Sequence, residues 1–192
     1  MKELTRYAFV ALIIASLSLS AGCAQQGLMA KAEPAGPEII SIEGYYEDKT
    51  LGFSFEYPAR LFSEETELKA ADVVLAREGV QRIPTFALIV SDIQSGVALK
   101  NVSALIEENN KKALPESTDH KIEETEMISL ESGVAANYTL MRWRFQGTIP
   151  IASAYVSVYK NGKMIQVAVS SMPGQPPVEQ LAKWAKSLKV AL

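Results

Sequence analysis

Two side chains in this 192-residue chain are candidates for chemistry, because each is the only one of its kind: Cys23 and His120. A lone cysteine cannot form a disulfide within its own chain, so Cys23 needs a modification or a second molecule to explain it. A lone histidine can act as a general base or change its charge near neutral pH. One cysteine and one histidine cannot supply the ligand cluster of a zinc site.

Cys23 follows a short N-terminal segment with Lys2 and Arg6 and then an uncharged apolar run, residues 8–20. This order is typical of a secretory signal, and the run is shorter than the roughly 20 residues of a membrane-spanning helix. The segment Leu19-Ser20-Ala21-Gly22-Cys23 resembles the lipobox of bacterial lipoproteins, with a serine where leucine is usual. The resemblance implies cleavage before Cys23 and attachment of acyl chains such as palmitate. Two or more chains anchor a protein stably in a membrane.

The N-terminal pattern divides the chain into three parts. We predict a lipoprotein signal peptide over residues 1–22, a flexible tether over 23–41 and a single domain over 42–192. The tether is rich in Ala, Gly, Pro and Gln, so it cannot bury enough apolar surface to fold. An ordinary signal cut after Ala24 is the alternative, and it would leave a soluble periplasmic or secreted protein. A lipidated chain would face the periplasm, and Ala24, in place of the aspartate of inner-membrane retention, favours the outer membrane.

The rest of the chain has no recognisable catalytic motif. No G-x-S-x-G elbow accompanies His120, and no glycine-rich phosphate loop or calcium-binding spacing of aspartates occurs. His120 lies beside Asp119 in a polar segment, where we expect it to be exposed at the start of a strand. The sequence therefore predicts no catalytic residues, no cofactor and no metal ligand, and it favours a protein that is not an enzyme.

The most distinctive local cluster is Arg142-Trp143-Arg144. Arginine and tryptophan are enriched in binding hot spots, so Arg142 and Arg144 are candidate contacts for an anionic partner or lipid headgroup. The alternative places Trp143 in the core and pairs both arginines with Glu124 or Glu126 on the far face. With 19 basic and 22 acidic residues, a net charge of −3, the chain lacks the basic character expected of a nucleic-acid-binding protein.

Alternating apolar and polar residues indicate that β-strands dominate the domain. Strands are predicted over 51–57, 73–76 and 85–91, and residues 45–47 are expected to form a hairpin with the first of them. A long hairpin is predicted from 122–130 and 134–145, with its register left open by a turn of two or three residues.

Asn161-Gly162 is the clearest turn signal, because both residues tolerate the positive φ of a type I′ turn. Setting Lys160 opposite Lys163 pairs apolar residues on one face of the hairpin. The predicted pairs are Val158 with Ile165, Val156 with Val167, and Ala154 with Val169. The opposite face is semi-polar and includes Tyr155, Ser157, Tyr159, Met164 and Gln166.

Helical periodicity appears over residues 99–114 and 177–190. Strands punctuated by two amphipathic helices indicate an α+β domain, a mostly antiparallel β-sheet with helices packed on its faces.

The segments Tyr45-Tyr46, 52–58 (GFSFEYP) and 184–188 (WAKSL) resemble PsbP-like domains. That resemblance implies an α/β/α sandwich and covers about residues 45–190. The PsbP-like proteins include a lumenal photosystem II subunit, a Ran-binding transport factor and DcrB-like bacterial envelope lipoproteins. The resemblance implies a scaffold that is used to bind other proteins.

These observations favour a membrane-anchored envelope lipoprotein that acts as a non-catalytic protein-binding or assembly domain. Its expected partners are the membrane, through lipid on Cys23, and an envelope protein, with no nucleic acid. One alternative is a carrier or sensor of a small apolar ligand, lined by Tyr138, Trp143, Tyr155 and Tyr159. The other alternative is a hydrolase whose site includes His120.

Overall fold

The computed structural model describes residues 44–50, 52–57, 62–64, 73–77, 85–113, 115–172 and 177–191. Cys23, the predicted signal peptide and the predicted tether lie outside these residues. No helix within the described ranges combines the length and the apolar character needed to cross a membrane.

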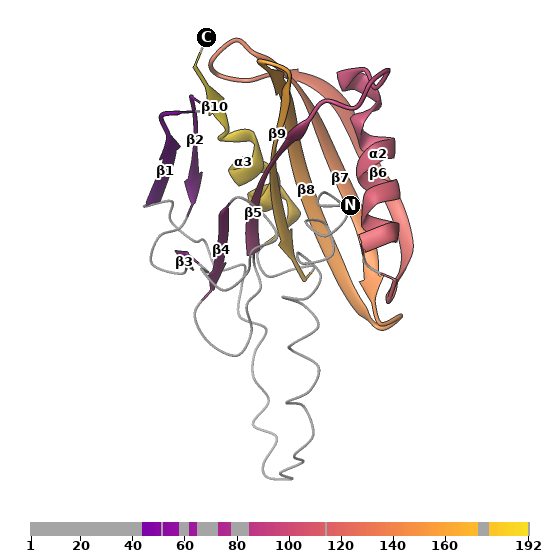
Figure 1. Ribbon diagram of the computed structural model, residues 1–192. Helices are drawn as coiled ribbons and strands as arrows, with labels where there is room; N and C mark the ends of the chain where they lie inside the picture. Colours follow the sequence, from indigo (N-terminus) through magenta and orange to yellow (C-terminus); the bar gives the residue numbers. More distant parts are fainter. Residues whose placement is uncertain are drawn as a thin grey trace.

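Most of the strands form one seven-stranded sheet, in which every neighbouring pair is antiparallel (Figure 1). Its order is β3-β4-β5-β9-β8-β7-β6. The strands are β3 (Phe62–Glu64), β4 (Val73–Arg77), β5 (Thr85–Asp92), β6 (Ser117–Ser129), β7 (Ala135–Phe145), β8 (Ile149–Lys160) and β9 (Lys163–Ser171). The predicted strands over 73–76 and 85–91 are confirmed.

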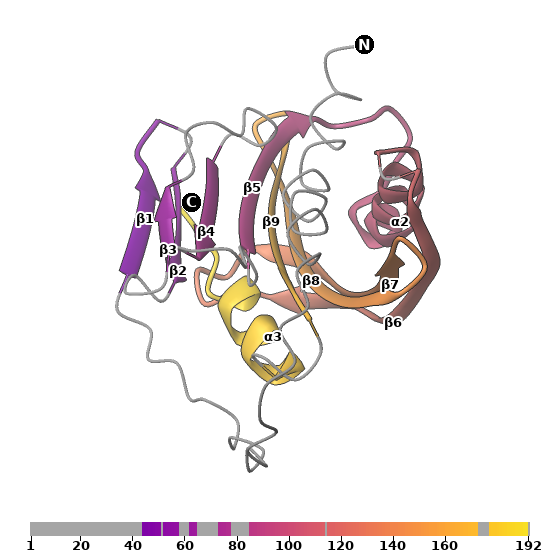
Figure 2. The ribbon, with the colours of Figure 1, turned by 90° about the horizontal axis from the view of Figure 1, so that it is seen from below.

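Among the described residues, one helix covers each face of this sheet (Figure 2). On one face lies α2 (Val102–Ala113), which follows a short 3-10 helix, η2 (Leu99–Asn101). On the other face lies α3 (Val178–Lys186), which follows Pro177. The predicted α+β class, with helices on both faces of an antiparallel sheet, is confirmed.

A second, three-stranded sheet joins the two ends of the domain. It consists of β1 (Gly44–Asp48), β2 (Phe53–Tyr57) and β10 (Lys189–Val190), in the order β1-β2-β10. The predicted hairpin of the first two strands is confirmed, whereas the predicted helix over 177–190 ends at Lys186. Its last residues form β10 instead, because Lys189 pairs with Ser54 and Val190 with Phe53.

Lys160 fastens this small sheet to the large one. Its Nζ atom donates to the carbonyl oxygens of Ala191, at 2.5 Å, and Gly52, at 3.3 Å. The amide of Ala191 also donates to the Gly52 carbonyl oxygen, at 2.8 Å. The end of the described chain is therefore held by both a strand and a cation.

The two faces of the large sheet bury different kinds of side chain. The α3 face is apolar, with Leu181 and Trp184 of the helix packed on the sheet. The α2 face also has an apolar cluster, but it buries hydroxyl and amide groups beside it. The buried polar residues on this face of the central strands are Asn137, Thr139, Ser153, Ser157, Gln166 and Ser170. The face of the β8–β9 hairpin predicted to be semi-polar is thus largely buried.

The predicted register of the β8–β9 hairpin is confirmed from Lys160 opposite Lys163 to Ala154 opposite Val169. Asn161 and Gly162 adopt φ values of 50° and 74°, the left-handed conformation that the turn requires. In the β6–β7 hairpin, the amide of Leu130 donates to the carbonyl oxygen of Val134 at 2.9 Å. That bond closes a three-residue turn and settles the register that the sequence left open.

Candidate functional site

The N-terminal end of β6 combines backbone irregularity with the chain's only histidine. The pairing of β6 with β7 is regular at Ser117 and Thr118, shifts before Lys121, and shifts again before Glu124. Within the first shift, Asp119 has a φ of 55°, in the left-handed region that aspartate tolerates better than most residues. Such bulges turn side chains away from the regular alternation of a strand.

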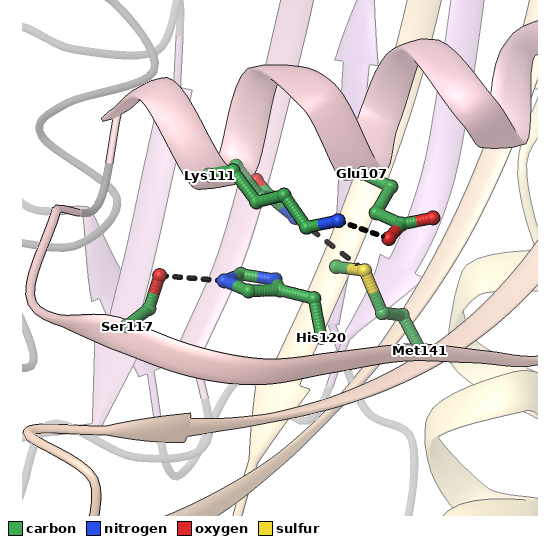
Figure 3. Close-up of polar contacts among 6 residues, drawn as sticks. Glu107, Lys111, Ser117, His120 and Met141 are labelled. Atoms are coloured by element: carbon green, nitrogen blue, oxygen red, sulfur yellow. Dashed lines mark hydrogen bonds and ion pairs between the residues drawn. The ribbon is translucent and has the colours of Figure 1, made fainter.

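His120 is directed from this bulge into the space beneath α2 (Figure 3). Its ring stacks on the indole of Trp143, with centroids 6.0 Å apart and ring planes within 4° of parallel. Its Nε2 atom lies 2.6 Å from Ser117 Oγ, within hydrogen-bond distance. His120 is half-buried, so the expectation of an exposed histidine at the start of a strand is wrong: the bulge rotates it inward.

The surroundings of His120 favour its neutral form. Burial lowers the pKa of the imidazole, and the ammonium of Lys111 lowers it further. The carboxylates of Glu107 and Asp119 oppose that shift without cancelling it. Lys111 and Glu107, one turn apart on α2, are joined by an ion pair of 2.5 Å, which places one charge of each sign above the ring (Figure 3).

The Ser117–His120 pair lacks the third member of a catalytic triad within the described residues. A triad histidine donates its second nitrogen to a carboxylate that orients it. Here the described structure gives the buried Nδ1 atom of His120 no hydrogen-bond partner, and the nearby Asp119 carboxylate pairs with Arg144 at 3.3 Å. The described part of the chain also holds no group of three His, Cys, Asp or Glu side chains placed to bind a metal ion.

Trp143 lies in the core, and the flanking arginines lie on the surface. The indole Nε1 donates to Ser153 Oγ at 3.1 Å, and Trp143 is 3% exposed. The Arg142 and Arg144 side chains are 44% and 50% exposed.

The predicted partners of the two arginines are wrong. The bulges shift β6 so that Glu123, rather than Glu124 or Glu126, reaches Arg142 Nε at 2.6 Å, while Asp119 reaches Arg144. Glu126 instead pairs with Lys186 at 2.9 Å.

The interface between α2 and the sheet contains buried hydrogen bonds and a small cavity. Asn110 of the helix donates to the Tyr155 hydroxyl at 2.9 Å, and Gln166 donates to Ser157 Oγ at 2.8 Å. Burial raises the pKa of the Tyr155 hydroxyl, so it stays protonated. The cavity beside these groups measures about 20 Å³, enough for about one water molecule.

The four aromatic residues predicted to line a ligand pocket do not share one site. Trp143, Tyr155 and Tyr159 belong to the α2 side of the sheet, whereas Tyr138 packs on the α3 side. There, the Lys186 ammonium lies 3.9 Å from the centroid of the Tyr138 ring. The sheet therefore separates Tyr138 from the other three.

A larger hollow, which the sequence did not reveal, lies along the three-stranded sheet. This groove has a volume of about 460 Å³ and is bounded by the β1–β2 hairpin, β10 and Ser132 of the β6–β7 turn. Tyr45, at 58% exposure, lies on its wall. Glu131, the first residue of that turn, pairs with Lys189 at 2.8 Å. Period-two alternation places Tyr45 on the outer face of β1, but only the pairing of β2 with β10 creates the groove.

No protein-family model and no curated protein sequence matches the chain. Among solved structures, the chain is similar to cyanobacterial PsbP (CyanoP) from Synechocystis sp. PCC 6803. That match has 20% sequence identity and a TM-score of 0.63, and it covers 83% of this chain and 98% of the other. It shows that the domain has the PsbP-like fold.

Two further structures are similar at TM-scores below 0.5, too distant to bear on this chain's function. One is LpqN, involved in cell envelope biogenesis of Mycobacterium tuberculosis, with 12% identity, 73% and 83% coverage and a TM-score of 0.49. The other is PA94 from Pseudomonas aeruginosa, described as a putative regulator, with 15% identity, 73% and 90% coverage and a TM-score of 0.43.

Proposed function

We propose that this PsbP-like domain is a lipid-anchored protein of the bacterial cell envelope that binds a protein partner and has no catalytic activity. Acylation of Cys23 holds it at the membrane, and the tether over residues 23–41 lets the domain, which begins its first strand at Gly44, reach away from the bilayer. The domain faces the periplasm, and the outer membrane is favoured over the inner.

The observation that carries the binding role is the contrast between the small cavity under α2 and the larger, open groove along the three-stranded sheet. The cavity under α2 holds about 20 Å³, whereas sites for small organic ligands usually span several hundred Å³. The groove along the three-stranded sheet has about 460 Å³, is open to solvent and presents Tyr45. Tyrosine is among the residues that contribute most to protein interfaces. Recognition on the outside of the fold is therefore better supported than a ligand or substrate inside it.

The Ser117–His120 pair supports the non-catalytic part of the proposal. No described carboxylate bonds to Nδ1, so the described structure does not orient the imidazole as a general base. The ring lies between Trp143 and α2 (Figure 3). A local role, in which His120 fills the bulge of β6, accounts for all of its contacts. We therefore favour binding over hydrolysis.

The anchor is tested by fractionation and by mass spectrometry of the mature N-terminus from cells. We expect the wild-type chain in the membrane fraction, with an N-terminal cysteine that carries acyl chains. The Cys23→Ser variant should lose the lipid and leave that fraction. A mature terminus without lipid would overturn the anchored form of the proposal.

The partner-binding role is tested by photocrosslinking in intact cells from position 45 in the groove. A matched probe at Lys100, which is exposed on the other side of the sheet in η2, controls for random encounters. We expect one protein to be captured reproducibly from position 45 but not from position 100. Identical crosslinking patterns from the two positions would contradict a recognition role for the groove.

A further inference from the structure

The outer edge of β6 is the longest open strand edge in the described structure. β6 has 13 residues and ends the seven-stranded sheet, and the described residues place no strand beyond it (Figure 2). An open edge presents unpaired N–H and C=O groups to which another extended chain can add.

Only the C-terminal half of this edge is regular. The two shifts in register lie between Thr118 and Glu124, and bulges of this kind prevent continued pairing on an edge. From Glu124 to Ser129, each residue pairs in unbroken succession with Leu140 down to Ala135. A neighbouring strand could therefore pair with this half but not with the bulged half.

The direction of the free backbone groups follows from the turn. Because the amide of Leu130 bonds to Val134, alternation along an antiparallel pair directs the amides of Ile128, Glu126 and Glu124 toward β7. The N–H and C=O groups of the intervening residues are directed away from the sheet. These residues are Thr125, Met127 and Ser129, all of which are exposed.

The side chains on either side of this edge define what it could accept. Met127 is 49% exposed and offers an apolar contact on the α2 side. Glu124 and Glu126 are exposed on the α3 side, where the Glu126 carboxylate, 43% exposed, also pairs with Lys186 at 2.9 Å. Burial raises the pKa of Tyr138 to about 12, and the carboxylates of Glu124, Glu126 and Glu179 add to that shift. Two copies of β6 would bring their glutamates onto one shared face, which disfavours self-pairing.

We propose that the backbone of Thr125, Met127 and Ser129 pairs with an extended, basic segment of the protein partner, which adds a strand to the seven-stranded sheet. This inference rests on the proposed partner-binding function and names one surface and the chemistry of its ligand. Lysine or arginine at alternate positions of the segment contacts Glu124 and Glu126, and an apolar residue packs on Met127.

The direct test uses the full chain in detergent micelles and a synthetic seven-residue peptide of alternating valine and lysine. Amide hydrogen exchange is followed by NMR spectroscopy. We expect the amides of Thr125, Met127 and Ser129 to gain tenfold or greater protection, while those of Glu124, Glu126 and Ile128 change little because they already bond to β7. A peptide of alternating valine and glutamate should have no effect. Unchanged exchange with both peptides would overturn the inference.

Variants separate strand pairing from non-specific attraction. Met127→Pro removes an outward N–H without removing a bond to β7 and should weaken binding of the lysine peptide at least tenfold. Met127→Thr keeps that N–H and should weaken binding far less. Equal affinities of the two variants would contradict strand addition.

Because Met127→Pro could also disturb the strand, a charge swap gives a second measurement. Exchanging Glu124 and Glu126 for lysine should transfer the preference to the glutamate peptide. Retention of the original preference would contradict the inference.

Photocrosslinking from position 127 in intact cells distinguishes failure of this inference from failure of the proposed function. Capture of the same partner from positions 45 and 127, with the second crosslink mapped to a lysine- or arginine-bearing segment, supports both. Capture from position 45 alone leaves the proposed function standing and overturns the strand addition. Absence of specific capture from either position overturns both.

Discussion

The two faces of the seven-stranded sheet are built on the same strands but hold their helices in different ways. Beneath α3, Trp184 is fully buried against apolar residues, with its ring 5.4 Å from that of Phe86. Beneath α2, Asn110 and Tyr155 bond to each other, and His120 occupies a bulge. Apolar burial is non-directional, whereas each buried hydrogen bond needs a partner at a fixed position.

The difference indicates which face sets the stability of the fold and which face sets its local geometry. Loss of apolar volume under α3 should cost more free energy than loss of any one polar contact under α2. On the α2 side, the polar contacts determine where individual side chains lie. The following experiments, all on the full chain in mild detergent, test this ranking from the largest expected effect to the smallest.

Trp184→Ala should produce the largest loss of stability. It removes a buried aromatic ring from the α3 face and leaves a cavity, so the free energy of unfolding should fall by about 3–5 kcal/mol in urea titrations. Lys183→Ala, on the exposed side of the same helix, should change it by less than about 0.5 kcal/mol. If Trp184→Ala lowered the free energy of unfolding less than Tyr155→Phe does, the expected ranking of the two faces would be reversed.

Tyr155→Phe should have an intermediate effect. It removes the hydroxyl that accepts from Asn110 and leaves that amide without this partner, at a cost of about 1–3 kcal/mol. The double variant with Asn110→Ala should cost less than the sum of the two single changes, because each single change breaks the same bond. Strict additivity in this thermodynamic cycle would show that the bond contributes nothing.

His120 should make stability depend on pH. Its pKa in the folded chain lies below the ordinary value of 6.5, so the unfolded chain binds a proton more readily. The free energy of unfolding should therefore fall as the pH drops below about 6.5 and level off beneath the folded pKa. His120→Phe, which can still stack on Trp143, should remove this slope, and since the chain has one histidine no other imidazole contributes. Persistence of the slope in the variant would contradict the assignment.

Arg142→Ala should have the smallest effect, because the ion pair with Glu123 lies where neither helix buries it. Exposed ion pairs contribute about 0.2–1 kcal/mol, and added salt should shrink the difference from wild type. If Arg142→Ala lowered the free energy of unfolding as much as Tyr155→Phe does, the ion pair would contribute as strongly as a buried hydrogen bond, and the expected ranking would be wrong.

Local sequence signals predicted the hairpins and helices well. Asn161-Gly162 fixed its own register, because turn chemistry and the alternation of apolar residues agree there. The helix over 99–114 is confirmed as η2 followed by α2, for a similar reason: one stripe of apolar side chains repeats at helical spacing. In both cases the information lies within about twenty consecutive residues.

Long-range pairing could not be predicted in this way. Leu188 continues the helical spacing of Leu181 and Ala185, so the sequence gives no sign that the helix stops at Lys186. Lys189 and Val190 form β10 because they pair with the distant strand β2. The groove beside Tyr45 depends on that pairing. The inward position of His120 was missed for a related reason, since a bulge depends on how β6 meets β7. Cys23 lies outside the described residues, so its predicted acylation stays a prediction.

The pairing of Ser54 with Lys189 also imposes an order of events during biosynthesis. The three-stranded sheet joins the earliest and the latest described strands, so it cannot be completed while Lys189 and Val190 are still inside the ribosome. A nascent chain therefore lacks this closure until β10 has left the ribosome. Removal of residues 189–191 should then prevent the completion of the three-stranded sheet, while the central hairpins β6–β7 and β8–β9 still fold.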